Sequence, residues 1–265
     1  MPELSIITIS YNMENEIAKT IESVLNQGFT DYEYIFIDGK STDKTVDIIE
    51  SYREQFESKG INYSVTSEPD KGIYDAMNKG IDKASGEWCI MLNSGDALCS
   101  SDTLSNVFSK KKTEADVVYG DTKNIEGKYC RVNKGNNIDL MTLQMPFCHQ
   151  SSLVRTSIHR QYKFNTEYKI SSVYNSFLRM YMDGKKFEYI DEVISLFDCS
   201  GVSSTNFWAV RKEYYKIKKA NSIKRNPTKE IKKLIMDFLS YNKKLVLKKY
   251  KPEAYYTEKK GWELF

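Results

Sequence analysis

The sequence lacks the patterns that mark several common classes of protein. Its cysteines are odd in number, widely spaced and without a C-x-x-C pair: Cys89, Cys99, Cys130, Cys148 and Cys199. A zinc or redox motif is therefore not indicated, and we interpret these residues as reduced thiols that pack as small hydrophobic groups. No apolar run approaches the roughly 20 residues of a membrane-spanning helix, and the first residues do not resemble a secretion signal. We therefore expect a soluble, cytoplasmic chain.

Two frequent nucleotide-binding loops are also absent. No G-x-G-x-x-G follows the first apolar run, and no G-x-x-x-x-G-K-[ST] occurs in the chain. A dinucleotide fold of the usual kind or a P-loop site is therefore not indicated. Histidine is scarce, with only His149 and His159. We interpret His159, beside Arg160 and Gln161, as a surface residue.

Positive and negative charges are divided unevenly along the chain. The segment from Arg211 to Lys251 holds 15 lysines and arginines against the three acids Glu213, Glu230 and Asp237, a balance of +12. Because the whole chain carries +3, the remainder carries −9. The body of the protein is therefore acidic and its tail strongly basic.

What the sequence does contain is a regular alternation of strand and helix patterns. Short apolar runs rich in Ile, Val, Tyr and Phe predict strands at residues 4–10, 32–38, 61–67 and 88–93. Apolar residues at helical spacing fill each interval between them. This order predicts βαβ units around a parallel sheet, and hence an α/β fold.

The later part of the chain is less regular. Its predicted elements are helices at 100–112, 171–184, 207–220 and 228–250 and strands at 115–121 and 186–198. Gly184 and Pro252 are expected to end the helices that precede them. Residues 122–150 are polar and read as irregular, as the flank of an active site often is.

Small and polar residues follow each of the first four strands. In an open parallel sheet, ligands bind at the carboxyl ends of the strands, because loops and helix N-termini converge there. The residues at these ends are Ser10, Tyr11 and Asn12; Asp38 and Gly39; Glu68, Asp70, Lys71 and Gly72; and Asn93, Ser94, Gly95 and Asp96. Turn or capping chemistry explains any one group, as it does Ser41, Thr42 and Asp43, but their coincidence on one rim indicates a binding site. Tyr74 and Met77, at helical spacing, we interpret as core.

Five motifs occur in the order in which a known family carries them. They are "SIITISYN" near the start, "IDGKSTDKT", "SEPDKGIYDAMNKGI", "WCIMLNSGD" and "CHQSSLVR" at 148–155. Over residues 4–205 the chain resembles the family two glycosyltransferases, in particular the bacterial members that build capsule, O-antigen or exopolysaccharide. The resemblance implies a GT-A fold, a Rossmann-like and mostly parallel sheet flanked by helices.

The same resemblance implies a division of the chain. A glycosyltransferase domain would occupy 1–205, with a donor-binding half at about 1–100 and an acceptor half at about 101–205. Residues 206–265 would form a basic helical C-terminal extension.

The resemblance also implies a nucleotide-sugar site at the strand ends. The acidic motif reads N-S-G-D here, so Asp96 alone offers a carboxylate to the Mg²⁺ or Mn²⁺ ion that bridges the two phosphates of the donor. One or two protein carboxylates are enough for such a cation, because it keeps several waters. The other residues implied in donor binding are Ser10, Tyr11 and Asp38 at the base and ribose, Asp70, Lys71 and Asp75 along the donor, and Asn12, Gly39, Ser94 and Gly95. His149 and Gln150 are expected near the acceptor or the metal.

One position departs from the family pattern. An inverting transfer needs a base that takes the proton from the acceptor hydroxyl, and similar sequences carry an aspartate where "KISSVYNSFLR" has Val173. Valine accepts no proton, so three alternatives are open: the base is a nearby acid such as Asp191 or Glu167, the catalytic step is slow or lost, or the chain carries a substitution that removed the base. Ser172 and Asn175 are poor bases near neutral pH.

The helix predicted at 228–250 is amphipathic and basic. Its apolar residues share one face and its lysines lie elsewhere: Ile231, Leu234, Ile235, Phe238, Tyr241 and Leu245, against Lys232, Lys233, Lys243 and Lys244. Such a helix suits two roles, peripheral contact of 211–251 with the anionic inner face of the plasma membrane, or packing on the catalytic domain with a solvated lysine face. No nucleic-acid-binding motif accompanies the charge, and we expect no nucleic-acid partner.

The predicted function is an inverting, metal-dependent glycosyltransferase. Its donor would be a UDP- or GDP-linked sugar, and its acceptor a saccharide carried, by resemblance, on a polyprenyl diphosphate. The substitution at Val173 supports an alternative, a catalytically impaired protein that binds a sugar nucleotide or a glycan. A nucleotidyltransferase that makes sugar nucleotides is disfavoured, because "SYNMENE" after the first strand lacks its Gly-rich, basic loop.

Overall fold

Four parallel strands form the first half of the sheet, as the alternation of strands and helices predicts. The structure, a computed structural model, describes residues 1–112, 114–199, 206–223, 227–250 and 262–265. The first four strands lie in the order β3-β2-β1-β4, and each neighbouring pair is parallel. Their bounds are β1 (Leu4–Ser10), β2 (Tyr32–Asp38), β3 (Asn62–Ser67) and β4 (Trp88–Met91). Ser10 is level with Asp38, so the carboxyl ends of β1 and β2 meet at one edge.

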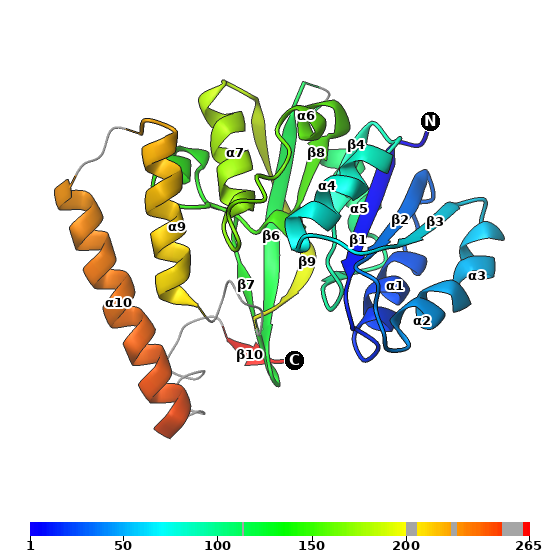
Figure 1. Cartoon of the computed structure of the whole chain (residues 1–265), viewed down its shortest axis with the longest axis horizontal. Helices are drawn as coiled ribbons and strands as arrows, with labels where there is room; N and C mark the ends of the chain where they lie inside the picture. Colours follow the sequence, from blue (N-terminus) through cyan, green and yellow to red (C-terminus); the bar gives the residue numbers. More distant parts are fainter. Residues whose placement is uncertain (113, 200–205, 224–226, 251–261) are drawn as a thin grey trace.

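Helices cover both faces of the sheet (Figure 1). They include α1 (Ile17–Leu25), α2 (Thr45–Ser51), α3 (Arg53–Glu57), α4 (Ile73–Lys83), α5 (Thr103–Lys110), α6 (Thr156–Gln161) and α7 (Ser172–Met182). Alternate residues of β1 separate two cores, because successive strand side chains point to opposite faces. Ile6 packs with apolar residues of α1, α3 and α5, and Ile7 packs with those of α4. A third core lies against α7.

The second half of the sheet is mixed. Antiparallel pairs join β4 to β8 and β8 to β6, whereas β9 runs parallel to β6 and antiparallel to β5. The bounds are β5 (Ala97–Leu98), β6 (Val117–Glu126), β7 (Tyr129–Asn133), β8 (Ser152–Arg155) and β9 (Phe187–Asp198). The prediction of parallel pairing is thus confirmed for the first hundred residues and is replaced by mixed pairing beyond them.

The expectation of irregular structure over residues 122–150 was wrong for its first part. β6 runs through to Glu126 and pairs with β7 in an antiparallel hairpin. Gly127 makes the turn with φ of +60°, a conformation that glycine adopts without strain. The strands were obscured in the sequence because much of this hairpin is only partly buried and carries polar side chains. The 3-10 helices Ile138–Thr142 and His149–Ser151 follow it.

The first helix of the predicted C-terminal extension packs as part of the body. α9 (Phe207–Ala220) stacks the ring of Tyr214 on that of Tyr174 in α7, with centroids 4.1 Å apart, and buries Ile217 in the third core. The boundary expected near residue 205 lies outside the described residues. In its packing, α9 is thus not separate from the body of the protein.

The second helix, α10 (Pro227–Tyr250), contacts α9 along one face. Phe238 packs against Trp208, and Arg211 forms an ion pair with Asp237. After it the chain returns to the sheet, where β10 (Glu263–Leu264) pairs with β7. The expected helix stop at Pro252 lies outside the described residues, as do the side chains of Lys233, Lys244 and Leu245. No described helix is both long and apolar enough to span a lipid bilayer.

Gly80 allows α4 to approach β1 closely. A Cβ atom at this position would lie 2.4 Å from Cγ2 of Ile7, inside a packed core. Alanine is ordinarily the better helix former by about 1 kcal/mol, but here it would force one element to move. We expect Gly80→Ala to lower the free energy of unfolding by about 1–3 kcal/mol in a urea titration. The control is Gly28→Ala, whose Cβ meets nothing closer than 3.8 Å; equal effects of the two substitutions would contradict this packing.

Candidate active site

The loop after β4 holds Asp96 at the carboxyl edge of the sheet. β4 lies between β1 and β8, so the loop starts from a buried support. Gly95 has φ of +95°, which a side chain would strain, and its N–H donates to Oγ1 of Thr20 (2.9 Å). The same hydroxyl donates to the carbonyl of Asp96 (2.7 Å). Thr20 of α1 therefore fixes this turn at two points.

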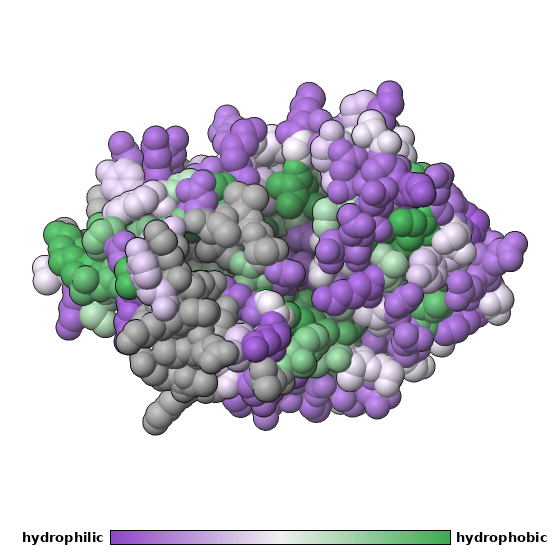
Figure 2. All heavy atoms as spheres, turned by 90° about the horizontal axis from the view of Figure 1, so that it is seen from below, coloured by the Kyte–Doolittle hydropathy of each residue, from purple (hydrophilic) through white to green (hydrophobic). Residues whose placement is uncertain are grey.

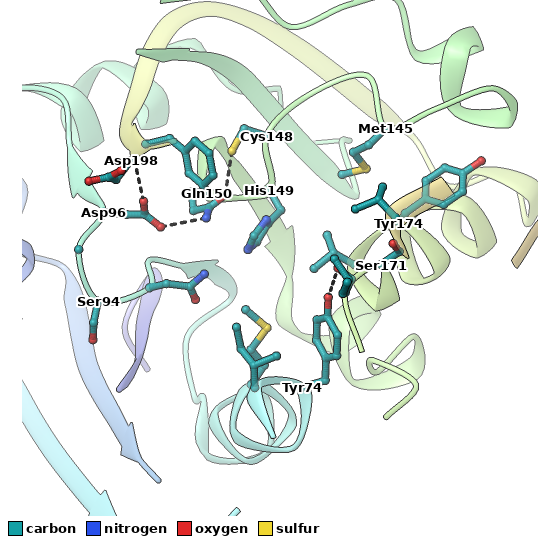
Figure 3. Close-up of a pocket in the computed structure, with 18 of the residues that line it drawn as sticks. Tyr74, Ser94, Asp96, Met145, Cys148, His149, Gln150, Ser171, Tyr174 and Asp198 are labelled. Carbon is teal, nitrogen blue, oxygen red and sulfur yellow. Dashed lines mark hydrogen bonds between the residues drawn. The ribbon is translucent and has the colours of Figure 1, made fainter. Parts of the chain in front are cut away.

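The carboxyl group of Asp96 is buried and points toward Gln150 (Figure 3). Nε2 of Gln150 donates to Oδ2 (2.9 Å), and the backbone N–H of Asp198 donates to Oδ1 (3.4 Å). Burial raises the pKa of Asp96 to about 7; the charge of Asp198 acts in the same direction, and the Gln150 hydrogen bond acts against it. The fold therefore holds this acid where its ionised form is unfavourable unless a cation is near.

A cavity of about 680 Å³ opens beside Asp96. At one end lie polar residues of the strand ends and their neighbours: Ser94, Asp96, Gln150 and Asp198 (Figure 3). Apolar residues make up much of the remaining wall: Met77, Met145, Phe147, Val173, Val210 and Tyr214. His149 lies between the polar end and the side of the cavity where Met145, Ser171 and Tyr174 are found. The cavity thus joins two surfaces of different chemistry.

Three buried polar atoms of the cavity residues have no hydrogen-bond partner among the described residues. They are Oδ1 of Asn93, Nε2 of His149 and Oγ of Ser171. Such atoms are uncommon in folded proteins, and contact with a ligand is one reason for them. Burial also lowers the pKa of His149 to about 4, so its imidazole is neutral near pH 7. The residues that line the cavity therefore include polar atoms that the described part of the chain does not satisfy.

Asp38, predicted to contact the nucleotide, is a buried hub at the ends of β1, β2 and β3. It accepts hydrogen bonds from Oγ of Ser10 (3.0 Å), Oγ of Ser67 (2.7 Å) and the N–H of Ser41 (2.8 Å). Neither Ser10 nor Asp38 lines the 680 Å³ cavity. The predicted donor residues in the loops next to them do not line it either. Asp38 therefore shapes a second, adjoining part of the strand-end surface by fixing the loops around it.

Three of the predicted donor residues meet beside this hub. A Cβ atom on Gly39 would lie 2.6 Å from Oδ2 of Asp70 and 3.3 Å from Cδ2 of Tyr11, so glycine lets these two side chains come this close to the backbone. The side of Tyr11 away from this contact is open, since the residue is 60% exposed. An exposed ring beside a carboxylate suits stacking of a base and hydrogen bonding of a ribose.

The other predicted donor residues of these loops have structural partners. Oδ1 of Asn12 accepts from the N–H of Thr42 (2.9 Å) and so joins two loops. The N–H of Lys71 donates to Oδ2 of Asp75 (3.1 Å), and Asp75 forms an ion pair with Lys79 (3.5 Å). These contacts organise the start of α4 at the edge of the site.

The structure does not bring either predicted base into the cavity. Asp191 is exposed and forms an ion pair with Lys134 (3.1 Å), which holds the pKa of Asp191 below its usual value. Glu167 is also exposed, and neither acid lines the cavity. Val173 does line it and packs against the two cores next to α4 and α7. The position where the resemblance expects an acid is thus part of an apolar wall.

Asp198 is a site residue that the sequence patterns did not reveal. It ends β9 as Asp38 ends β2, and it lies next to Asp96 on the cavity wall. The signal available in the sequence was an acid at the end of a predicted strand. It was missed because β9 comes late in the chain and reaches the site only through its pairing with β5 and β6.

The interpretation of His159 as a surface residue was wrong. It is 2% exposed, and its ring packs on that of Phe164 with centroids 5.2 Å apart. Burial lowers the pKa of His159 to about 4. The polar residues next to His159 in the sequence were misleading, because α6 turns the side chain of His159 toward the core. Tyr74 and Met77 are buried as predicted, and both also line the cavity.

Comparison with known proteins identifies a family. The sequence profile described as glycosyl transferase family 2 matches residues 5–184. A curated relative from Mycobacterium bovis, the "PGL/p-HBAD biosynthesis glycosyltransferase", is 28% identical over 220 residues, which are 81% of this chain and 83% of the relative.

Two solved structures share the fold. TarS 1-349 from S. aureus in complex with UDP-GlcNAc has a TM-score of 0.64 at 20% identity, covering 81% of this chain and 64% of that one. The mannosyltransferase PcManGT from Pyrobaculum calidifontis in complex with GDP-Man and Mn²⁺ has a TM-score of 0.64 at 14% identity, covering 85% of this chain and 65% of that one. This chain therefore spans about two thirds of each solved chain.

Burial of Asp96 makes the stability of the metal-free protein depend on pH. An aspartate with a pKa of about 3.9 unfolded and about 7 folded holds more protons in the folded state between these values. Stability therefore falls as pH rises through that window and is level above it. Because Asp96→Asn removes this titration, we expect it to gain about 2–3 kcal/mol relative to wild type between pH 5 and pH 8, in urea titrations with EDTA. A difference that does not vary with pH would contradict the burial.

Proposed function

This chain belongs to glycosyl transferase family 2, and we propose that it moves a sugar from a nucleotide-sugar donor to a saccharide acceptor with inversion at the anomeric carbon. One observation carries the proposal: Asp96 and three residues whose buried polar atoms have no partner among the described residues line one cavity at the carboxyl edge of the parallel strands. Ligands of open α/β sheets bind at this edge.

We propose that the donor is a UDP- or GDP-linked sugar. The open surface formed by Tyr11, Gly39 and Asp70 beside the Asp38 hub suits a base and its ribose. The two solved structures of the same fold hold UDP-GlcNAc and GDP-Man. A donor placed this way would carry its diphosphate toward Asp96, and its sugar would project into the cavity.

Mg²⁺ or Mn²⁺ is the proposed cofactor, with Asp96 as its protein ligand. The residues fit such an ion, because Asp96 is a buried carboxyl group whose ionised form is disfavoured by burial, and Asp198 lies beside it. No group of three or more His, Cys, Asp and Glu side chains suited to a metal occurs among the described residues. A hard cation can do with fewer, since it takes oxygen ligands from waters and donor phosphates. When bound, it would offset charge on the departing nucleoside diphosphate. Gln150 holds the Asp96 carboxyl in place for this contact.

Val173 favours a second candidate function. It lines the cavity where the resemblance expects the base, and the acids that line the described cavity are Glu16, Asp96 and Asp198. A protein that binds a sugar nucleotide without transferring its sugar would keep the same donor site. Formation of a glycosylated product by the purified wild-type chain would reject this second candidate.

Donor binding is the direct test of the proposed site. In calorimetry with Mn²⁺, we expect at least one UDP- or GDP-sugar to bind the wild type and to lose affinity in EDTA. Asp96→Asn should weaken that binding at least about tenfold, because the ion loses its charged ligand. The control is Asp191→Asn, since this acid is exposed and lies outside the cavity. Metal-independent binding of every donor, or normal binding by Asp96→Asn, would refute the assignment.

We further propose that α10 places the enzyme on an anionic membrane surface, where an acceptor on a polyprenyl diphosphate would lie. Residues spaced at four, four and seven form an exposed apolar stripe along the helix: Ile231, Ile235, Leu239 and Val246. Exposed Lys232 and Lys243 lie on the same helix. Figure 2 shows apolar surface gathered at the α10 end of the molecule. Apolar insertion together with basic residues is the usual basis of interfacial binding.

Co-sedimentation with vesicles tests this surface. We expect the full chain to bind vesicles that contain phosphatidylglycerol and to bind neutral vesicles less. Ile235→Ser with Leu239→Ser should abolish binding, and Lys232→Glu with Lys243→Glu should weaken it by about 1 kcal/mol per lysine or more. Val132→Ser is the control, because Val132 is exposed on β7 rather than on α10. Wild-type protein that stays unbound at low salt would contradict the membrane role.

A further inference from the structure

We propose that the cavity receives an acceptor whose reacting hydroxyl lies beside an apolar group, either the methyl of a 6-deoxysugar or an alkyl or aryl aglycone. This acceptor class rests on the transfer function proposed above and deepens it. It also gives Val173 a role, as a residue that determines acceptor specificity.

Apolar side chains from three separate segments form the wall that would contact such a group. Met145 comes from the segment before β8, Val173 from α7, and Val210 and Tyr214 from α9. Val173 also packs against two of the hydrophobic cores, so its place in the wall is fixed. A sugar hydroxyl pressed against these side chains would lose its water without gaining a partner, whereas a methyl or aryl group would be favoured.

Polar groups near this wall already have partners in the protein. The hydroxyls of Tyr74 and Tyr174 donate to main-chain carbonyls. The carboxylate of Glu213 accepts the backbone N–H groups of residues 169–171 at 2.7–3.0 Å. These contacts also hold the loop before α7 in position. They leave mostly hydrocarbon surface for an acceptor on this side of the cavity.

Two residues of the cavity carry a buried polar atom without a partner among the described residues, one between the polar end and the apolar side and the other on the apolar side. Nε2 of His149 and Oγ of Ser171 have no partner among the described residues, and Ser171 is 4% exposed. Figure 3 shows His149 between Asp96 and Ser171. One atom can accept from a hydroxyl and the other can donate to it. A hydrogen bond to either residue would orient an acceptor hydroxyl, with its neighbouring group on the apolar wall.

Part of this wall lies beyond the residues that the family profile matches. The match ends at residue 184, whereas Val210 and Tyr214 of the wall belong to α9. The valine at position 173 extends the same surface into the family region, which an aspartate there would interrupt with a charge.

Matched acceptor pairs test the proposal with the full chain and the donor identified by calorimetry. Methyl α-L-fucoside against methyl α-L-galactoside isolates the deoxy methyl, and phenyl against methyl β-D-glucoside isolates the aglycone. Products are quantified by mass spectrometry. A small change in an apolar pocket alters kcat/KM about 10–200-fold. We expect the apolar member of at least one pair to be favoured about tenfold or more, and the responding pair identifies the source of the apolar group.

A variant of the wall sharpens the test. Val173→Thr keeps the shape of the side chain and adds a hydroxyl, so it should reduce that preference about tenfold. Val132→Thr makes the same change at an exposed residue outside the cavity and should leave the preference unaltered. Equal use of both members of every pair by the wild type, or a preference that Val173→Thr does not change, overturns the proposal.

A binding measurement covers the case in which none of these glycosides is a substrate. Saturation-transfer NMR on the donor-loaded protein then compares the same pairs. Contacts from the phenyl or deoxy-methyl protons that weaken in Val173→Thr support the proposal, and their absence in the wild type overturns it. Failure of every donor to bind in calorimetry rejects the transferase function instead, so the two failures can be told apart.

Discussion

The site depends on one carboxyl group that the fold holds where its charge is unfavourable. Asp96 follows a strand in the middle of the sheet, its turn is fixed by Thr20, and its side chain is directed by Gln150. Burial at this point disfavours ionisation, an electrostatic cost that a bound cation would offset. Functional sites often carry such local costs, which the rest of the structure sustains. The stable parallel sheet beneath the loop is what makes the arrangement possible.

The first hundred residues could be predicted from sequence because their signals are local. Strands at 4–10 and 32–38 match the structure at both ends, since buried parallel strands read as continuous apolar runs and stop where polar residues begin. The carboxyl ends of parallel strands share one edge, so the grouping of Tyr11, Gly39 and Asp70 followed from the strand order. The order of the strands was therefore enough to predict which edge of the sheet carries the candidate site.

The later part of the chain was less predictable because its contacts are made between distant segments. Asp198 reaches Asp96 only through the pairing of β9 with β5 and β6, which no short pattern encodes. His159 is buried by rings of other elements although its sequence neighbours are polar. α9 read as part of a basic tail, yet Tyr214 stacks on Tyr174 and completes the cavity. The amino-acid composition of that helix reflects its solvated lysines and gives no sign of its buried face.

We propose that Asp96 is the protein ligand of a cation that holds the donor diphosphate. Anomalous diffraction at the manganese edge, from crystals grown with Mn²⁺ and the donor that binds in calorimetry, is the most direct test. We expect one strong peak in coordination contact with the Asp96 carboxylate and the donor phosphates, and no such peak in Asp96→Asn. A manganese peak bound to other residues, or a donor bound at the strand ends with its phosphates remote from Asp96, would contradict it.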